Sequence, residues 1–218
     1  NPLTGRWVTI VAERAERPTD FAPRNVHVEA GPDRPCPFCP GNEEATAPSL
    51  EQLDAGGSWK MRVMPNKYPA FYGDEPFSVH HLGPVHVEAE ASGIHEVFVF
   101  TPDHNGGLHS LSDVDAADMM RVLQRRFQEH ASATNLRFTQ AIINHGREAG
   151  ASLAHPHGQL LGLPFVPGEV LEEQRGFSRF EGGCILCATV EAELVDGKRV
   201  VFANDDVVCI CPFWSGSP

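Results

Sequence analysis

Residues 150–160 read Gly150-Ala-Ser-Leu-Ala-His155-Pro-His157-Gly-Gln159-Leu160, and this stretch decides the expected fold. Its two histidines are separated by Pro156, whose ring fixes its own φ and biases the preceding residue away from the helical region. The backbone is therefore predicted to be extended, and residues two apart in a strand leave the same face. A solitary His-x-His pattern would equally describe two solvent-facing histidines in a strand. The longer string is far more specific and predicts an active-site strand.

The residue types in this strand suit chemistry at neutral pH. An imidazole can act as nucleophile, general base or metal ligand. Gly158 is expected to leave room for a substrate beside His157, and the Gln159 amide can hydrogen-bond an oxyanion.

Composition bounds the possible partners. The chain has 218 residues and a formal net charge of -12, which argues against nucleic acid as a partner. It contains no run of about 18 apolar residues, and its amino terminus lacks a basic and then apolar signal pattern. We therefore expect a soluble, cytoplasmic protein with no membrane partner.

The pattern of apolar residues predicts an α+β fold with an antiparallel-rich mixed sheet and packed helices. One helix should begin at Ser112, where Ser112 and Asp115 form its cap. Its core-facing stripe is predicted to be Ala116, Met119, Met120, Leu123 and Phe127. A second helix is expected over 169–180. Strands are expected over 6–12, 61–64, 94–100, 136–144 and 159–163, and near Val200 and Val207.

The six cysteines include two Cys-x-x-Cys pairs, Cys36/Cys39 and Cys184/Cys187. A disulfide framework does not suit a chain of this length without an export signal, so metal binding is the better use of the pairs. The spacing lets Cys36 and Cys39 reach one tetrahedral ion, and His104 and His155 are the next candidate ligands. Such a site would be closed and structural, and its soft ligands favour zinc.

Two alternatives to this metal site remain open. One is a four-cysteine site that joins both pairs across a long spacing. The other is a redox dithiol, which we disfavour because neither pair is expected to open a helix after a strand. Cys209 and Cys211 are expected to pack in a strand, and the remaining histidines, His95 and His130 among them, are expected to be superficial or structural.

A faint internal repeat divides the chain. Each Cys-x-x-Cys pair is followed by a strand and an asparagine, Asn66 after the first pair and Asn204 after the second. We therefore expect residues 1–180 to form one histidine-triad-like repeat that holds the active-site motif. Residues 181–218 would then be the start of a second, truncated repeat.

Seven motifs together resemble the galactose-1-phosphate uridylyltransferases, a branch of the histidine-triad nucleotidyltransferases. They occur in family order and comprise Asn1-Pro-Leu-Thr-Gly-Arg-Trp7, the Arg14/Arg17 turn, Cys36-x-x-Cys39, Pro65-Asn66, Thr101-Pro-Asp-His104, Asn144-x-Gly146 and the 150–159 string. The resemblance covers most of residues 1–180. It implies two histidine-triad repeats around an antiparallel-rich sheet, in a homodimer.

The resemblance also implies roles for individual residues. His157 would be the nucleophile that takes a nucleoside monophosphate from a nucleotide sugar, and a hexose 1-phosphate would be the second substrate. Gln159 and Ser152 would bind phosphate oxygens beside the backbone of Gly150 and Ala151. Arg14 and Arg17 would offset phosphate charge, although without the family they would be interpreted as a solvated charge run. Asn66 and Asn144 match nucleotide contacts, and Cys36, Cys39, His104 and His155 match zinc ligands.

Two features leave the substrate open. The family's common Asn-Asp pair is Asn66-Lys67 here, and Cys184 and Cys187 resemble a subgroup with a second zinc site, some members of which transfer adenylyl groups. The resemblance as a whole makes uridylyl transfer from UDP-glucose to galactose 1-phosphate the leading hypothesis. The alternatives are an ADP-sugar phosphorylase or adenylyltransferase, a hydrolase of the same superfamily, and a nucleotide-binding zinc module without catalysis.

Overall fold

A computed structural model describes residues 7–10, 35–151 and 153–214 of the chain. The chain divides into two compact units, Asn1–Val166 and Pro167–Pro218. The α+β class is confirmed, and every strand pair in the described part of the chain is antiparallel.

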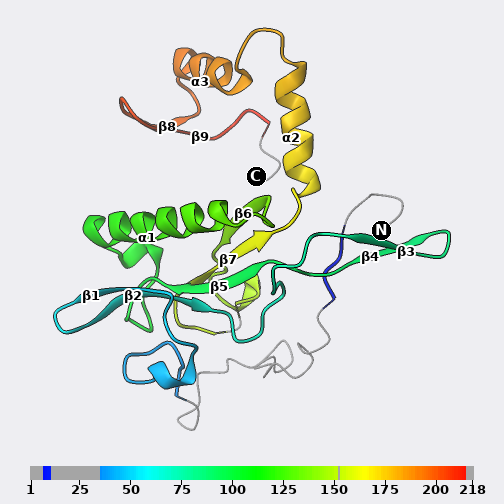
Figure 1. Ribbon diagram of the computed structural model, residues 1–218. Coiled ribbons are helices and arrows are strands. Elements are labelled where there is room, and N and C mark those ends of the chain that lie inside the picture. The colour runs from blue at the N-terminus through cyan, green and yellow to red at the C-terminus, as the bar shows by residue number, and fades with distance from the viewer. Residues whose placement is uncertain (1–6, 11–34, 152, 215–218) are drawn as a thin grey trace. The chain divides into compact units, whose positions relative to one another are not determined.

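The first unit contains a five-stranded sheet with the order β1-β2-β5-β7-β6 (Figure 1). The sequence predicted four of these strands, with ends that differ by a few residues, but not β1. Their bounds are β1 Glu51–Ala55, β2 Ser58–Pro65, β5 Ile94–Val99, β6 Phe138–Ile142 and β7 His157–Leu163. Short 3-10 helices cover Glu43–Ala45, Leu108–Ser110 and Arg147–Ala149. The central strand β5 pairs with β7 so that Val99 faces His157 and Val97 faces Gln159.

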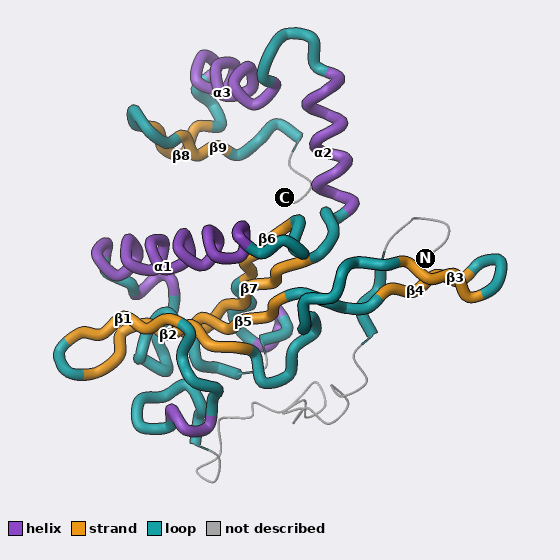
Figure 2. The backbone as a smooth tube through the Cα atoms, viewed as in Figure 1, coloured by secondary structure: helices purple, strands orange, loops and turns teal. Residues whose placement is uncertain are grey.

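Helix α1, Asp113–Ser132, lies along one face of this sheet (Figure 2). Its predicted cap is present, since the Ser112 hydroxyl accepts the Asp115 backbone N–H at 3.1 Å. The predicted apolar stripe is only partly correct. Met119 and Leu123 are buried, but Met120 is 60% and Phe127 is 37% exposed.

Arg126 and His130 occupy buried positions of α1 instead. Both reach Glu96 on β5, with Arg126 Nε 3.0 Å from one carboxylate oxygen and His130 Nε2 3.3 Å from the other. The buried face of the helix is therefore partly charged, which a search for apolar periodicity does not detect.

The sheet separates two apolar clusters. The cluster on the α1 side is built from Met61, Val63, Phe98, Phe100, Met119, Val122, Leu123 and Leu160. The other joins Phe38, Trp59, Met64, Val97 and Val99, with Cys36 and Leu153 packed against it. The segment that holds the first cysteine pair therefore covers the face of the sheet opposite α1.

A second hairpin of the first unit, β3 Val79–Leu82 and β4 His86–Ala89, was not predicted from the sequence. The expected strand over 6–12 is wrong for residues 7–10, which carry no strand, and its other residues lie outside the described part. Trp7 packs against Phe77 with a centroid distance of 5.6 Å.

The second unit contains α2 Gly168–Arg179, α3 Ile185–Asp196, β8 Val200–Ala203 and β9 Val208–Ile210. Helix α2 and both strands were predicted, but α3 was not. In the described part of the chain, no helix has the length and apolar character needed to cross a membrane.

Candidate active site and metal centre

Strand β7 presents His157 and Gln159 on the face of the sheet opposite α1. The two residues alternate with Gly158 and Leu160, and Leu160 belongs to the cluster beneath α1. Because side chains alternate along a strand, His157 and Gln159 share the other face. His157 is 8% exposed, and Gln159 is half-buried.

The local backbone fixes the orientation of the His157 ring. Its Nδ1 lies 2.8 Å from the carbonyl oxygen of His155. A carbonyl only accepts, so Nδ1 must carry the proton and donate it, which leaves the lone pair of the neutral ring on Nε2. The Phe38 ring lies against the imidazole with a centroid distance of 5.2 Å. A neutral imidazole in this tautomer is able to act as a nucleophile through Nε2.

The expectation that Gly158 leaves space for a substrate is wrong. A Cβ at this position would overlap the ring of Phe98 and lie 2.9 Å from the carbonyl oxygen of Ile142. The missing side chain of Gly158 therefore allows Phe98 to pack tightly beneath β7, on the α1 side, and opens no space beside His157.

The structure brings together the four residues that the sequence suggested as metal ligands. Ligand atoms of Cys36, Cys39, His104 and His155 all lie within 4.8 Å of one another. Cys39 Sγ is 3.3 Å from His104 Nδ1 and 3.6 Å from His155 Nδ1. Tetrahedral zinc with ordinary bond lengths would separate sulfur and nitrogen ligands by about 3.6 Å, so the donor set fits such an ion. A four-cysteine site is not needed to complete the first pair.

His155 is held in the form that a metal requires. Its Nε2 lies 2.9 Å from the Thr101 carbonyl oxygen, so Nε2–H donates there and Nδ1 faces the cysteines. Burial lowers the pKa of His155 and favours the neutral ring, despite the opposing effect of the Thr101 contact. Burial, together with the neighbouring Cys36, raises the pKa of Cys39 to about 11. A bound cation would reverse this effect on the thiol, since the ligand is the thiolate.

Only some of the residues predicted to contact phosphate or nucleotide lie in the described part of the chain. Arg14, Arg17 and Ser152 lie outside the described residues. Gly150 is exposed with φ +79°, and the Ala151 N–H donates to the Gly146 carbonyl at 3.2 Å. Asn144 is half-buried in the segment that follows β6.

A residue that the sequence did not single out, His95, contacts both Gln159 and Asn66. His95 is 5% exposed, and its Nε2 is 2.8 Å from Gln159 Oε1 and 3.0 Å from Asn66 Nδ2. The sequence alone could show only that His95 lies two residues before Val97 in a predicted strand. That this strand pairs with the histidine motif, with Val97 opposite Gln159, is known only from the structure.

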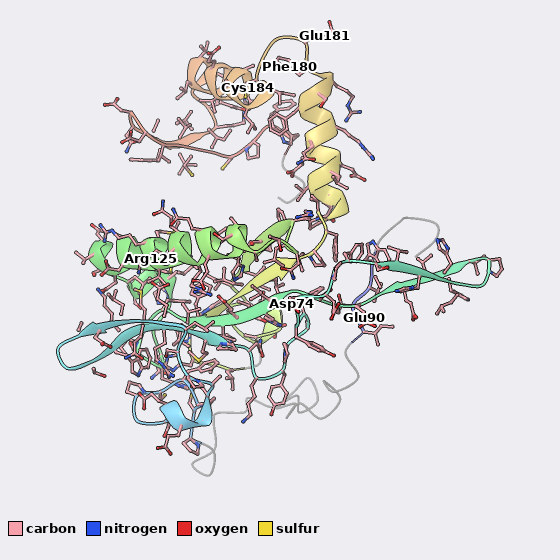
Figure 3. All side chains as sticks on the ribbon, in the orientation of Figure 1. Asp74, Glu90, Arg125, Phe180, Glu181 and Cys184 are labelled. Atoms are coloured by element: carbon pink, nitrogen blue, oxygen red, sulfur yellow. The ribbon has the colours of Figure 1, made fainter. Side chains whose placement is uncertain are left out.

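The second cysteine pair lies in the second unit, and both thiols are exposed. Cys184 is the N-cap of α3 (Figure 3), but the element before this helix is α2 and not a strand, so the expectation that neither pair opens a helix after a strand is confirmed for this pair. A backbone N–H and the thiol of Cys187 lower the pKa of Cys184. Cys209 lies in β9 as expected, but it is exposed and not packed, like Cys211 just beyond the strand.

Comparisons with known proteins identify the family. The family description "Galactose-1-phosphate uridyl transferase, N-terminal domain" matches residues 1–167. An ADP-glucose phosphorylase of Arabidopsis thaliana is 30% identical over 223 residues, which cover 100% of this chain and 62% of that protein. A galactose-1-phosphate uridylyltransferase of Haemophilus influenzae is 29% identical over 220 residues, 99% of this chain and 61% of that one.

A solved structure gives the same result. The Arabidopsis thaliana ADP-glucose phosphorylase with bound ADP-glucose superposes with a TM-score of 0.68 at 28% identity, and the match covers 99% of this chain and 63% of that one. The chain thus spans about three fifths of the length of these relatives. On the match over residues 1–167, the chain belongs to the galactose-1-phosphate uridylyltransferase family.

Proposed function

We propose that the complete protein is a nucleotidyltransferase that works through a covalent nucleotidyl-histidine on His157. The hydrogen bond between His157 Nδ1 and the His155 carbonyl is the observation that carries the proposal, because it leaves Nε2 as the attacking atom. The two relatives described above support this reaction class, since one is an ADP-glucose phosphorylase and the other a galactose-1-phosphate uridylyltransferase.

The proposed reaction has two balanced steps. His157 Nε2 attacks the α-phosphorus of a nucleotide sugar, a P–N bond forms, and the bond from phosphorus to the bridging oxygen breaks to release a hexose 1-phosphate. The positive charge that develops on the ring is stabilised by the Nδ1–H···O=C hydrogen bond. A phosphate oxygen of the acceptor then attacks the same phosphorus, and the P–N bond breaks to restore the neutral imidazole.

Other residues that the sequence suggested would assist this chemistry. The Gln159 amide would donate to non-bridging phosphate oxygens, as would Ser152, and Arg14 and Arg17 would offset their charge. Asn66, Asn144, Gly150 and Ala151 would complete the substrate contacts.

We assign zinc to the site formed by Cys36, Cys39, His104 and His155, on the chemistry of the donors. When bound, the ion would link three segments of the chain and fix the backbone that precedes His157. Cys184 and Cys187 would supply two ligands of a second site.

As leading activity we propose transfer of a uridylyl group from UDP-glucose to galactose 1-phosphate, within galactose metabolism, by a cytoplasmic homodimer. Two family members of this activity support it at 29% and 27% identity. The second candidate is an ADP-sugar phosphorylase or adenylyltransferase, which the 30% identity to the Arabidopsis thaliana enzyme and the second cysteine pair favour.

Intact-protein mass spectrometry of the complete protein tests this proposal. The protein is mixed separately with UDP-glucose and with ADP-glucose. We expect an added uridylyl mass that disappears when galactose 1-phosphate is supplied, and an adenylyl mass instead would establish the second candidate.

The matched variant is His157→Ala, which should lose the adduct entirely while it keeps its metal. Labelling that persists in His157→Ala would refute the covalent mechanism. Metal-loaded wild-type protein that forms no adduct with either nucleotide sugar would refute the proposed enzyme and favour a binding module.

A further inference from the structure

The imidazole of His95 is buried beside the candidate active site and has no role in the chemistry proposed above. His95 lies on β5, opposite Leu161 of β7, and Gln159 lies opposite the next inward-facing residue, Val97. His95 is therefore a diagonal neighbour of Gln159 on the face that also carries His157. Its Nε2 is 2.8 Å from Gln159 Oε1.

A backbone donor decides the tautomer of His95. The N–H of Ala70 points at His95 Nδ1 with a separation of 2.8 Å. A backbone N–H can only donate, so Nδ1 must accept and the proton of the neutral ring must lie on Nε2. The contact with Gln159 is then a hydrogen bond from Nε2–H to the amide oxygen.

The same reasoning explains the neighbouring Asn66. Its Oδ1 accepts the backbone N–H of Tyr68 at 2.9 Å, so its NH2 group faces the His95 ring. Asn66 Nδ2 lies 3.0 Å from His95 Nε2, but both nitrogens carry hydrogen. We therefore interpret that approach as a contact and not as a hydrogen bond, and the proton of Nε2 is directed to Gln159.

We propose that His95 is a positioning residue that sets the orientation of the Gln159 amide. The terminal amide of Gln159 can adopt two orientations that differ by a flip of about 180°. In the wrong one, its oxygen would face the anionic phosphate and repel it. Because His95 Nε2–H engages Oε1, the NH2 group of Gln159 remains the part that can donate to a phosphoryl oxygen. The inference rests on the proposed role of Gln159 in nucleotidyl transfer.

Two substitutions of His95 separate its two hydrogen bonds. In His95→Asn, the side-chain oxygen can stand near the former Nδ1 and still accept from Ala70, but nothing reaches Gln159. In His95→Gln, the terminal NH2 can stand near the former Nε2 and still donate to Gln159, while the Ala70 N–H loses its acceptor.

The experiment measures the single-turnover rate of His157 nucleotidylation in the complete protein by intact mass, with whichever nucleotide sugar labels the wild type. We expect His95→Asn to slow this step by about 10- to 100-fold, since a misplaced polar group at the reacting centre costs that much. His95→Gln should recover most of the rate. A purely structural role predicts the reverse, because only His95→Asn keeps the contact that holds the backbone at Ala70.

A double substitution completes the test. In a Gln159→Ala background, His95→Asn should slow the reaction no further, whereas an independent effect would multiply and would overturn the inference. Equal rates in wild type and His95→Asn would also overturn it and leave the covalent mechanism intact. Absence of labelling in the wild-type protein is the separate result that refutes the proposed function.

Discussion

At the scale of single residues, Gly158 allows β7 to lie close to the side chains beneath it. A methyl group there would meet the ring of Phe98, which is buried in the core cluster beneath α1, and the backbone carbonyl of Ile142. We expect Gly158→Ala to lower the free energy of unfolding by about 2 kcal/mol, as overpacked cores do. Urea denaturation of both proteins measures the change.

The matched control for this substitution is Gly176→Ala. Gly176 lies within α2, where an added Cβ meets nothing within 4 Å. Alanine in a helix is expected to be neutral or stabilising by about 0.5 kcal/mol. A Gly158→Ala variant as stable as Gly176→Ala would show that Phe98 moves aside without cost, and the packing argument would then be wrong.

At the scale of elements, the buried charges between α1 and β5 should make stability depend on pH. Burial alone would raise the pKa of Glu96, but hydrogen bonds from His130 and Arg126 outweigh it, so the pKa is lowered from 4.5. A carboxylate with a lowered folded-state pKa stabilises the fold above its unfolded pKa. That contribution is lost as pH falls through the folded-state value.

Glu96→Gln tests this expectation. Removing the charge leaves the buried Arg126 with only the exposed carboxylate of Glu129 as a counterion, so we expect the free energy of unfolding to fall by about 3 kcal/mol at pH 7. The difference in the free energy of unfolding between Glu96→Gln and the wild type should become smaller as pH falls below about 4.5. The control is Glu129→Gln, since that carboxylate also pairs with Arg126 but is 68% exposed and should contribute less than about 1 kcal/mol. Equal stability of the two variants at pH 7 would contradict the expectation.

The same elements show what the sequence could and could not predict. The caps and runs of apolar residues located α1, β5, β7 and α2 to within a few residues. They did not identify the whole buried face of α1. Arg126 and His130 are buried there because they contact Glu96, which is distant in sequence. Helix α3 escaped detection because its apolar residues show little helical periodicity, and the residues of β3 and β4 are largely exposed.

At the scale of the whole molecule, the motifs identified most residues of the candidate site but not the contacts between them. Spacing alone suggested that Cys36, Cys39, His104 and His155 share an ion, and the fold brings them together. The link from His95 to Gln159 depends on the register of β5 against β7, which no local pattern encodes. Residues that act through a partner on another strand are therefore the ones that sequence reasoning missed.

The candidate metal site joins segments that are far apart in the chain, since Cys39 is 65 positions from His104 and 116 positions from His155. Closing loops of this length by cross-linking restricts the unfolded chain strongly, so the ion should stabilise the segments it joins. We expect Cys39→Ser to lose one equivalent of zinc by elemental analysis. Amides near His104 and His155 should exchange hydrogen at least about tenfold faster, which corresponds to only about 1.4 kcal/mol of local opening free energy.

Because the chain divides into two units, we expect the faster exchange in Cys39→Ser to be confined to the first unit. Strands β8 and β9 belong to the unit Pro167–Pro218, and the four ligands all belong to the other. Exchange in β8 and β9 should therefore be unchanged in Cys39→Ser. The exposed Cys209 provides the control, because Cys209→Ser removes a thiol without touching the cluster and should keep the full metal content. Full zinc content and unaltered exchange in Cys39→Ser would remove Cys39 from the ligands. Faster exchange throughout both units would mean that the ion stabilises the whole chain and not the first unit alone.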